Sequence, residues 1–199
     1  MLTLHAADAS PETALLVDGA RIAAVGPYEE LAAAHQDARL RRWPGILTPG
    51  LLNPYGPELL EQTYHPDPRE AGTYGTEPIT GERGREILRT DPVRLGASAR
   101  RGVQRLLAHG TVAIGGELRA RAAQDAVRRA GLAVGQRPPN LPGPPSLWPR
   151  PLVLLPAPAP GGPARFAVFD VADRAELVRR GPATCVATVL GGRLVYRAR

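Results

Sequence analysis

The chain has 199 residues, of which 43% are hydrophobic and 22% are charged, and its formal net charge is +6. This length suits one domain of ordinary size or a small domain that carries an insertion. No run of about 18 apolar residues is present, which argues against a membrane-spanning helix. The single cysteine excludes a disulfide framework within the chain.

All 25 basic residues are arginine, and they are spread along the chain in pairs, with acidic residues between them. A nucleic-acid footprint needs a continuous basic stripe and usually stacking aromatic side chains, whereas only 5% of these residues are aromatic. The composition therefore argues against a nucleic-acid partner. Cys185 in an apolar run, and an N-terminus with neither a basic start nor a long apolar segment, predict a cytoplasmic protein.

The first elements are predicted to be a hairpin, a short helix and a strand. Residues 14–26, "ALLVDGARIAAVG", predict two strands that turn at Asp18-Gly19, because this dipeptide accepts the positive φ angles of a tight turn. A short helix is expected within residues 28–40, where two acidic residues lie toward the positive N-terminal end. The chain then returns through "ILTPGLLN", residues 46–53, as a buried strand.

The middle of the chain predicts a long loop followed by an α/β unit. Residues 55–90 hold many prolines, glycines and threonines with little periodicity, so we expect an irregular loop. A helix should begin at Asp91-Pro92 and end at Gly110. A strand, a helix and a strand follow, and they form a βαβ unit with parallel strands, at residues 111–116, 117–130 and 132–134.

The last part of the chain predicts a linker and then ordered β-structure. Residues 138–163 hold half of the 22 prolines, which excludes a regular helix and favours extended backbone. Beyond this linker we expect a strand at 166–169, a short helix at 173–180 and two strands at 184–190 and 193–198. The last two strands should be joined by a turn at Gly191-Gly192.

The two ends of the chain resemble the amidohydrolase superfamily, most closely its imidazolonepropionase-like and aminodeoxyfutalosine deaminase-like members. The matching stretches include "ALLVDGARIAAVGPYEEL", "ILTPGLLN", "ARFAVFDVAD" and "VATVLGGRLVYRAR". In that family a composite β-sandwich, built from both ends of the chain, carries an inserted metal-dependent (β/α)8 barrel. The resemblance thus implies a relationship to hydrolases of C–N bonds other than peptide bonds.

The expected fold class is α+β, with a composite β-sandwich and a short βαβ remnant of a (β/α)8 barrel between its halves. The insert is far too short for a whole barrel, which typically has about 250 residues. Four segments follow from this interpretation. The sandwich comprises residues 1–52 and 164–199, and the irregular loop comprises residues 53–90. The barrel remnant comprises residues 91–137, and the Pro-rich linker comprises residues 138–163.

The family's metal-ligand pattern is missing from this sequence. Relatives follow the "PGLIN" strand with a His-x-His pair, whose imidazoles share one side of an extended strand and reach one metal. The resemblance places Tyr55 and Pro57 at those positions. Neither residue supplies a ligand nitrogen. We therefore predict no catalytic residue, no metal ligand and no cofactor at this site.

One local cluster remains as a weak alternative. His65, Asp67 and Glu70 lie close together in "TYHPDPRE" and could meet a metal ion in an irregular loop. A plain surface loop is the simpler interpretation, because the flanking prolines stiffen the backbone.

Three functional hypotheses stay open at this point. The first is a non-catalytic amidohydrolase-like protein, a pseudoenzyme, that acts as a scaffold or partner subunit. The second is a residual or partner-complemented C–N hydrolase or deaminase that acts on a small cyclic amide or purine-like substrate. The third is a module that binds a small molecule or anion through the arginines around the loop. Because the βαβ unit alone cannot bury both faces of its sheet, we expect a homo-oligomer or a protein partner to cover it.

Overall fold

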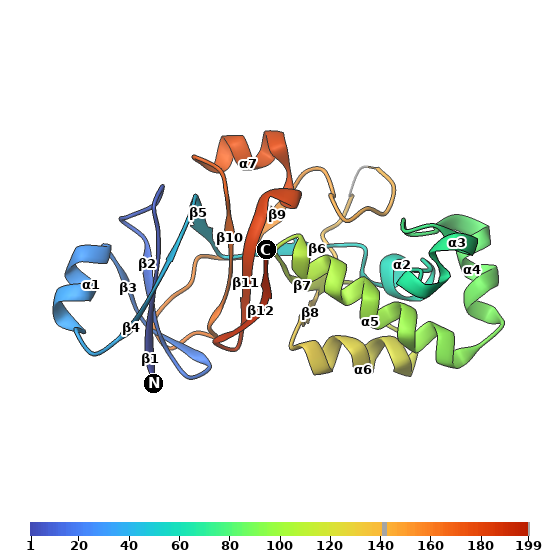
Figure 1. Cartoon of the computed structure of the whole chain (residues 1–199), viewed down its shortest axis with the longest axis horizontal. Helices are drawn as coiled ribbons and strands as arrows, with labels where there is room; N and C mark the ends of the chain where they lie inside the picture. The colour runs from blue at the N-terminus through green and yellow to red at the C-terminus, as the bar shows by residue number, and fades with distance from the viewer. Residues whose placement is uncertain (141–142, 199) are drawn as a thin grey trace. The chain divides into compact units, whose positions relative to one another are not determined.

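The computed structural model describes residues 1–140 and 143–198, which form a mixed α/β protein with several sheets (Figure 1). The chain divides into two compact units. Unit 1 comprises Met1–Leu52, Leu107–Val112 and Pro151–Arg199, and unit 2 comprises Asn53–Leu106 and Ala113–Arg150. None of the helices in the described part of the chain is long and apolar enough to cross a membrane.

The first sheet of unit 1 comes from the N-terminal segment. Its strand order is β3-β2-β1-β4, where only the β1–β4 pair is parallel, and the strands are β1 (Leu2–Ala7), β2 (Ala14–Asp18), β3 (Arg21–Gly26) and β4 (Arg39–Trp43). The predicted hairpin at Asp18-Gly19 is confirmed. The helix predicted within residues 28–40 is present but shorter, as α1 (Tyr28–Ala34). The end of the predicted range, from Arg39, instead belongs to β4, which pairs with β1.

The second sheet of unit 1 is built mainly from the C-terminal segment. It is antiparallel throughout, in the order β12-β11-β10-β5, from β5 (Ile46–Thr48), β10 (Arg165–Phe169), β11 (Cys185–Leu190) and β12 (Arg193–Arg197). The Asp173 side chain caps α7 (Arg174–Arg180) by accepting from the Glu176 N–H, and a 3-10 turn, η2 (Pro182–Thr184), follows. The elements predicted at this end of the chain are confirmed.

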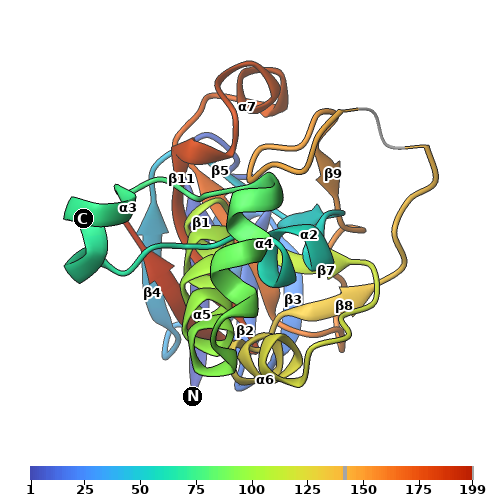
Figure 2. The ribbon, with the colours of Figure 1, turned by 90° about the vertical axis from the view of Figure 1, so that its right-hand side faces the viewer.

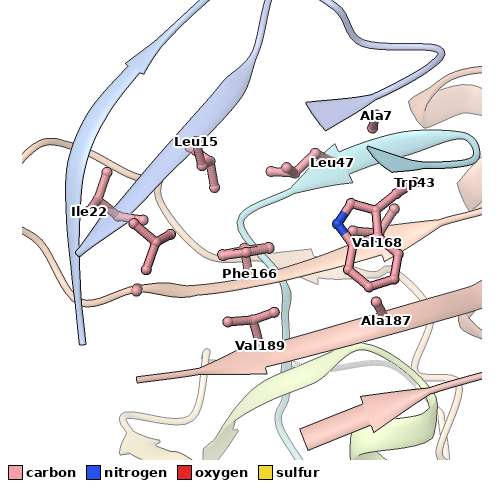
Figure 3. Packing of buried hydrophobic residues seen from close by; sticks show 11 residues of the cluster. Ala7, Leu15, Ile22, Trp43, Leu47, Phe166, Val168, Ala187 and Val189 are labelled. Carbon is pink, nitrogen blue, oxygen red and sulfur yellow. The ribbon is translucent and has the colours of Figure 1, made fainter. Parts of the chain in front are cut away.

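Both sheets contribute to one hydrophobic cluster. The first sheet supplies Leu15, Ile22 and Trp43 among others, and the second supplies Phe166 and Val189 (Figure 3). Phe166 is fully buried, and its ring meets the ring of His5 edge to face at 4.9 Å between centroids. Burial of such side chains is the main stabilising term for this unit.

The turns at the ends of the two sheets also meet. Gly192 has φ 71°, and a Cβ added there would collide with the carbonyl oxygen of Gly19 in the hairpin of the first sheet. Gly191 also has positive φ, 56°, but has open space around it. The Gly192 position is therefore restricted by the contact between turns as well as by its own dihedral angle.

A shorter pairing in unit 1 involves the Pro-rich segment. β6 (Leu51–Asn53) pairs antiparallel with β9 (Val153–Leu154), and the Leu51 N–H donates to the Gly110 carbonyl at 2.9 Å. The Pro-rich segment contains no helix in its described part, as predicted, but it is more than a linker. Besides β9, Gly162 accepts a hydrogen bond from the Ile22 N–H at 2.9 Å.

Unit 2 contains the predicted βαβ arrangement. β7 (Thr111–Gly115), whose last three residues belong to this unit, pairs in parallel with β8 (Ala133–Gly135) through α6 (Arg121–Ala130). Gly131, with φ 80°, ends α6 as expected. The helix begins later than predicted, because the Arg119 and Ala120 N–H groups donate to the Glu61 carboxylate at 2.7 and 2.6 Å.

The predicted long helix is confirmed as α5 (Pro92–Ala108). Its first turn is closed by Asp91, whose carboxylate accepts from the Val93 N–H at 2.8 Å. α5 and α6 lie close together (Figure 2). A Cβ added at Gly96 of α5 would lie 3.5 Å from the Cβ of Ala122 in α6. Small residues at this crossing let the two helices approach closely.

The prediction of an irregular loop over residues 53–90 is wrong. This stretch forms short helices, namely α2 (Gly56–Glu61), the 3-10 turn η1 (Pro68–Glu70), α3 (Ala71–Tyr74) and α4 (Gly81–Arg89). They are one to three turns long, which is too short to show a 3.6-residue periodicity in sequence. Tertiary burial of Leu60, Tyr64 and Leu88 stabilises them instead.

The contact between turns generates the first prediction. Gly192→Ala should destabilise unit 1 by about 3 kcal/mol or more, whereas Gly191→Ala should cost only about 1 kcal/mol, the usual penalty for a Cβ at positive φ. Urea denaturation of both variants and the parent measures the difference. Equal losses in the two variants would contradict close packing of the Gly19 and Gly192 turns.

Candidate functional site

The chain changes from strand to helix directly after β6. The Asn53 side chain accepts a hydrogen bond from the Tyr55 N–H at 3.0 Å, and its amide donates to the Ser146 carbonyl at 2.9 Å. Such a side-chain turn redirects the backbone. Tyr55 is then the N-cap residue of α2, with φ −105° and ψ 38°. The backbone at Tyr55 therefore does not continue as an extended strand.

The two residues of interest from the sequence, Tyr55 and Pro57, lie at the start of this helix. Tyr55 is only 7% exposed, and its hydroxyl donates to the Gly143 carbonyl at 3.1 Å. The Arg137 guanidinium lies 5.9 Å from the Tyr55 ring centroid and forms an ion pair with Glu58 at 2.5 Å. Pro57 occupies the first turn of α2, where its missing N–H costs no hydrogen bond.

His65 is fully buried, so the interpretation of its segment as a plain surface loop is wrong. Its Nε2 lies 2.8 Å from the Leu59 carbonyl oxygen, and its backbone N–H donates to the Ser98 hydroxyl at 2.9 Å. Gly102 of α5 gives the ring its space, because a Cβ there would lie 2.7 Å from Nε2. A carbonyl can only accept, so Nε2 carries the proton, and Nδ1 has no partner among the described residues.

Burial keeps His65 neutral. It lowers the pKa of His65 from 6.5 to about 4, aided by the positive charges of Arg105 and Arg101 and opposed by the hydrogen bond to Leu59. A neutral imidazole in this position packs and orients its neighbours. The backbone carbonyl of His65 also accepts a hydrogen bond from the Arg101 Nε at 2.7 Å, which ties the segment to α5.

Asp67 and Glu70 do not converge with the His65 ring. Asp67 caps η1 by accepting from the Arg69 N–H at 3.0 Å, and it pairs with Arg101 at 3.3 Å. Glu70 accepts a hydrogen bond from the Tyr64 hydroxyl. This bond lowers the pKa of Glu70, while burial and the same bond raise the pKa of Tyr64 to about 12. Each candidate therefore has its own structural partner.

Arginine–tyrosine contacts complete this network. The Arg94 guanidinium lies 3.6 Å from the Glu70 carboxylate and 5.8 Å from the Tyr64 ring centroid. Within residues 1–140 and 143–198, no three His, Cys, Asp or Glu side chains are grouped so that they could hold a metal ion. The network orients this segment and pairs its charges.

One buried pair, His5 and Trp43, has no signal in the sequence, because its members lie 38 residues apart in the chain. The Trp43 indole N–H donates to His5 Nδ1 at 3.2 Å, and His5 is 2% exposed. Burial, with a smaller contribution from Arg41, lowers the pKa of His5 to about 4. Only the parallel register of β1 with β4 brings these two side chains together, so no local motif could have indicated it.

A known family model matches part of the N-terminal segment. Residues 14–35 match the model of the imidazolonepropionase-like composite domain of bacteria. The match covers β2, β3 and α1, and it confirms the resemblance stated from the "VDGARIAAVG" hairpin. No curated protein sequence matches the chain.

Several solved structures are similar to this chain at low identity. Guanine deaminase from Bradyrhizobium japonicum is 21% identical, with a TM-score of 0.39 over 61% of this chain and 27% of that one. An adenosine deaminase from Xanthomonas campestris with bound zinc is 16% identical, with a TM-score of 0.43 over 66% of this chain and 32% of that one. N-isopropylammelide isopropylaminohydrolase from Burkholderia multivorans is 19% identical, with a TM-score of 0.44 over 68% of this chain and 37% of that one. The chain spans about a third of the length of these proteins.

The buried histidines generate the second prediction. Unfolding raises the histidine pKa from about 4 to 6.5, so the unfolded chain binds more protons below pH 6.5 and stability falls as the pH is lowered. Each histidine should cost about 2 kcal/mol of stability between about pH 7 and about pH 5. His65→Gln should remove about half of this dependence, because His5 supplies the rest.

Urea denaturation at the two pH values measures the effect. His35→Gln is the matched control, since His35 is a half-buried histidine at the end of α1. The control should keep the pH dependence of the parent. An unchanged dependence in His65→Gln would contradict a neutral, buried His65.

Proposed function

We propose that this protein is a non-catalytic relative of the amidohydrolases, which acts as a scaffold or as a partner subunit. One observation carries the proposal: the positions that the resemblance assigns to the family's His-x-His pair hold Tyr55 and Pro57 at the start of a helix. The chain keeps the surrounding imidazolonepropionase-like hairpin and the "TPGLLN" strand.

The residues present at these positions do not fit the metal that the family implies. Proline has no side-chain donor or acceptor, and the Tyr55 hydroxyl already donates to the Gly143 carbonyl. In addition, a His-x-His pair reaches one metal because an extended strand places both side chains on the same side. The turn at Asn53 and the helix from Gly56 remove that backbone geometry.

The fold supports the same proposal. We assign the two packed sheets of unit 1 to the composite β-sandwich of the amidohydrolase type, made of residues 1–52 and 164–199. We assign residues 91–137, which carry the parallel β7–β8 pair, to a remnant of the (β/α)8 barrel. A remnant of this size cannot enclose a substrate as a closed barrel does.

A hollow of about 450 Å³ on unit 2 is where we place the partner, and we favour a second copy of this chain. Apolar side chains line it, including Leu118, Val127 and Val134, and Val134 is 56% exposed. Glu117 and Arg128 line the same hollow. Two copies related by a two-fold axis would bury the same apolar patch on each, as isologous interfaces do.

Metal analysis and turnover test the loss of catalysis. We expect no tightly bound metal after purification without chelators and incubation with zinc, iron or manganese. We also expect no hydrolase activity from Tyr55→His or Pro57→His, because each restores one ligand of a larger set. Near-stoichiometric metal in the parent, or turnover of a cyclic amide or aminopurine by any of these proteins, would revive the hydrolase alternative.

Sedimentation velocity tests the second copy. Val134→Asp should shift the protein from dimer toward monomer, because it places a charge in the apolar hollow. The control is Val178→Asp in α7, where the valine is 63% exposed. A parent that is monomeric at high concentration, or equal behaviour of the two variants, would contradict this interface.

A further inference from the structure

We propose that unit 1 binds a small organic carboxylate in a pocket where the inner face of the first sheet meets the Gly191-Gly192 turn. The pocket has a volume of about 330 Å³, and it is lined by His5, Arg41, Arg193, Val17 and Leu194 among others. It is separate from the segment at Tyr55 and does not depend on the proposed loss of catalysis.

His5 presents a hydrogen-bond donor to this pocket. The Trp43 indole can only donate, so His5 Nδ1 must be the acceptor and the proton of the neutral ring must lie on Nε2. No described residue accepts a hydrogen bond from Nε2. His5 is 2% exposed and still lines the pocket. A ligand oxygen in the pocket could therefore accept a hydrogen bond from this donor.

Arg41 lies beside His5 on the inner face of the first sheet. The two residues are paired in the parallel register of β1 and β4, so their side chains leave the same face. Trp43, two residues further along β4, is on that face too and is part of the cluster shared by both sheets. Arg41 is thus a cation that faces the interior layer, and no described carboxylate pairs with it.

The pocket has a positive charge without a countercharge among its described lining residues. Arg41 and Arg193 line it, and no lining residue is acidic. Asp18, which lies at the end of β2, forms an ion pair with the N-terminal amine at 3.4 Å. Burial and Arg41 together lower the pKa of His5, which keeps the ring neutral near pH 7 and preserves Nε2 as a donor.

These groups match a carboxylate with an apolar body. A guanidinium binds a planar carboxylate through two parallel hydrogen bonds, and the His5 N–H offers a further donor. Val17 and Leu194 supply apolar contact for the rest of the ligand. An inward-pointing charge on the edge strand β4 would also discourage pairing with another chain. That role alone does not require the free donor on His5.

Titration with benzoate, followed by NMR, tests the proposal. We expect saturable shifts of the Trp43 indole N–H and the Val17 and Leu194 methyl groups. Benzamide, which has the same shape without the charge, should cause no saturable shift. Arg41→Gln should weaken benzoate binding by about tenfold or more, as expected for loss of a charge-assisted pair.

Arg42→Gln is the matched control. Arg42 is the next residue of β4, and it stacks on Tyr28 at 4.6 Å from the ring centroid, on the other face of the sheet. This variant has the same change in net charge and should keep the benzoate affinity within about twofold. Arg193→Gln is the second test variant if Arg41→Gln does not fold, and it should also weaken binding.

Three results would overturn the proposal. Equal effects of benzoate and benzamide would show that the charge is not recognised. Equal losses in the Arg41 and Arg42 variants would show that binding follows net charge and not this pocket. Inorganic phosphate that binds the same residues as tightly as benzoate would show an unspecific oxyanion site without a subsite for an organic body.

Discussion

The packing of the two sheets of unit 1 around Phe166 is the interaction on which the rest of this unit depends. The first sheet comes from the N-terminal segment and the second mainly from the C-terminal segment, so their core joins parts of the chain about 150 residues apart. Neither sheet could bury its apolar face without the other. The same packing fixes the Gly19 and Gly192 turns and places His5 against Phe166.

A change of backbone direction decides what the segment after β6 can do. The Asn53 side chain holds Tyr55 in a turn, and the helix that follows buries Leu60. A metal-binding pair of side chains on one side of a strand needs extended backbone, and this chain has used the same residues to start a helix. The absence of histidine at Tyr55 and Pro57 and the helical backbone that begins there are therefore consistent with each other.

Both buried histidines are neutral, but their surroundings differ. His65 is enclosed by α5, with Gly102 against its ring, so it acts as a packing and orienting group. His5 Nδ1 accepts a hydrogen bond from Trp43, and the residue lines a pocket with two arginines. A neutral ring donates from one nitrogen only, and in His5 the indole leaves that donor free.

Much of the fold was predictable where the signal is local. The Asp18-Gly19 turn, the Asp91 start of α5 and the Gly131 end of α6 depend on the conformational preferences of a few residues, and all are present. The short helices between Gly56 and Arg89 were missed, because one to three turns carry no clear periodicity and gain their stability from burial. The later start of α6 was missed for a similar reason, since it depends on Glu61, which is distant in sequence.

The sequence by itself determined the composition, the hairpin and "TPGLLN" signatures and the absence of histidine at Tyr55 and Pro57, since these are properties of single residues and short runs. Only the tertiary structure decided that His65 is buried and that Arg41 lies beside His5. The physical reason is that burial and parallel strand register depend on contacts between residues far apart in the chain, and no local pattern encodes such contacts.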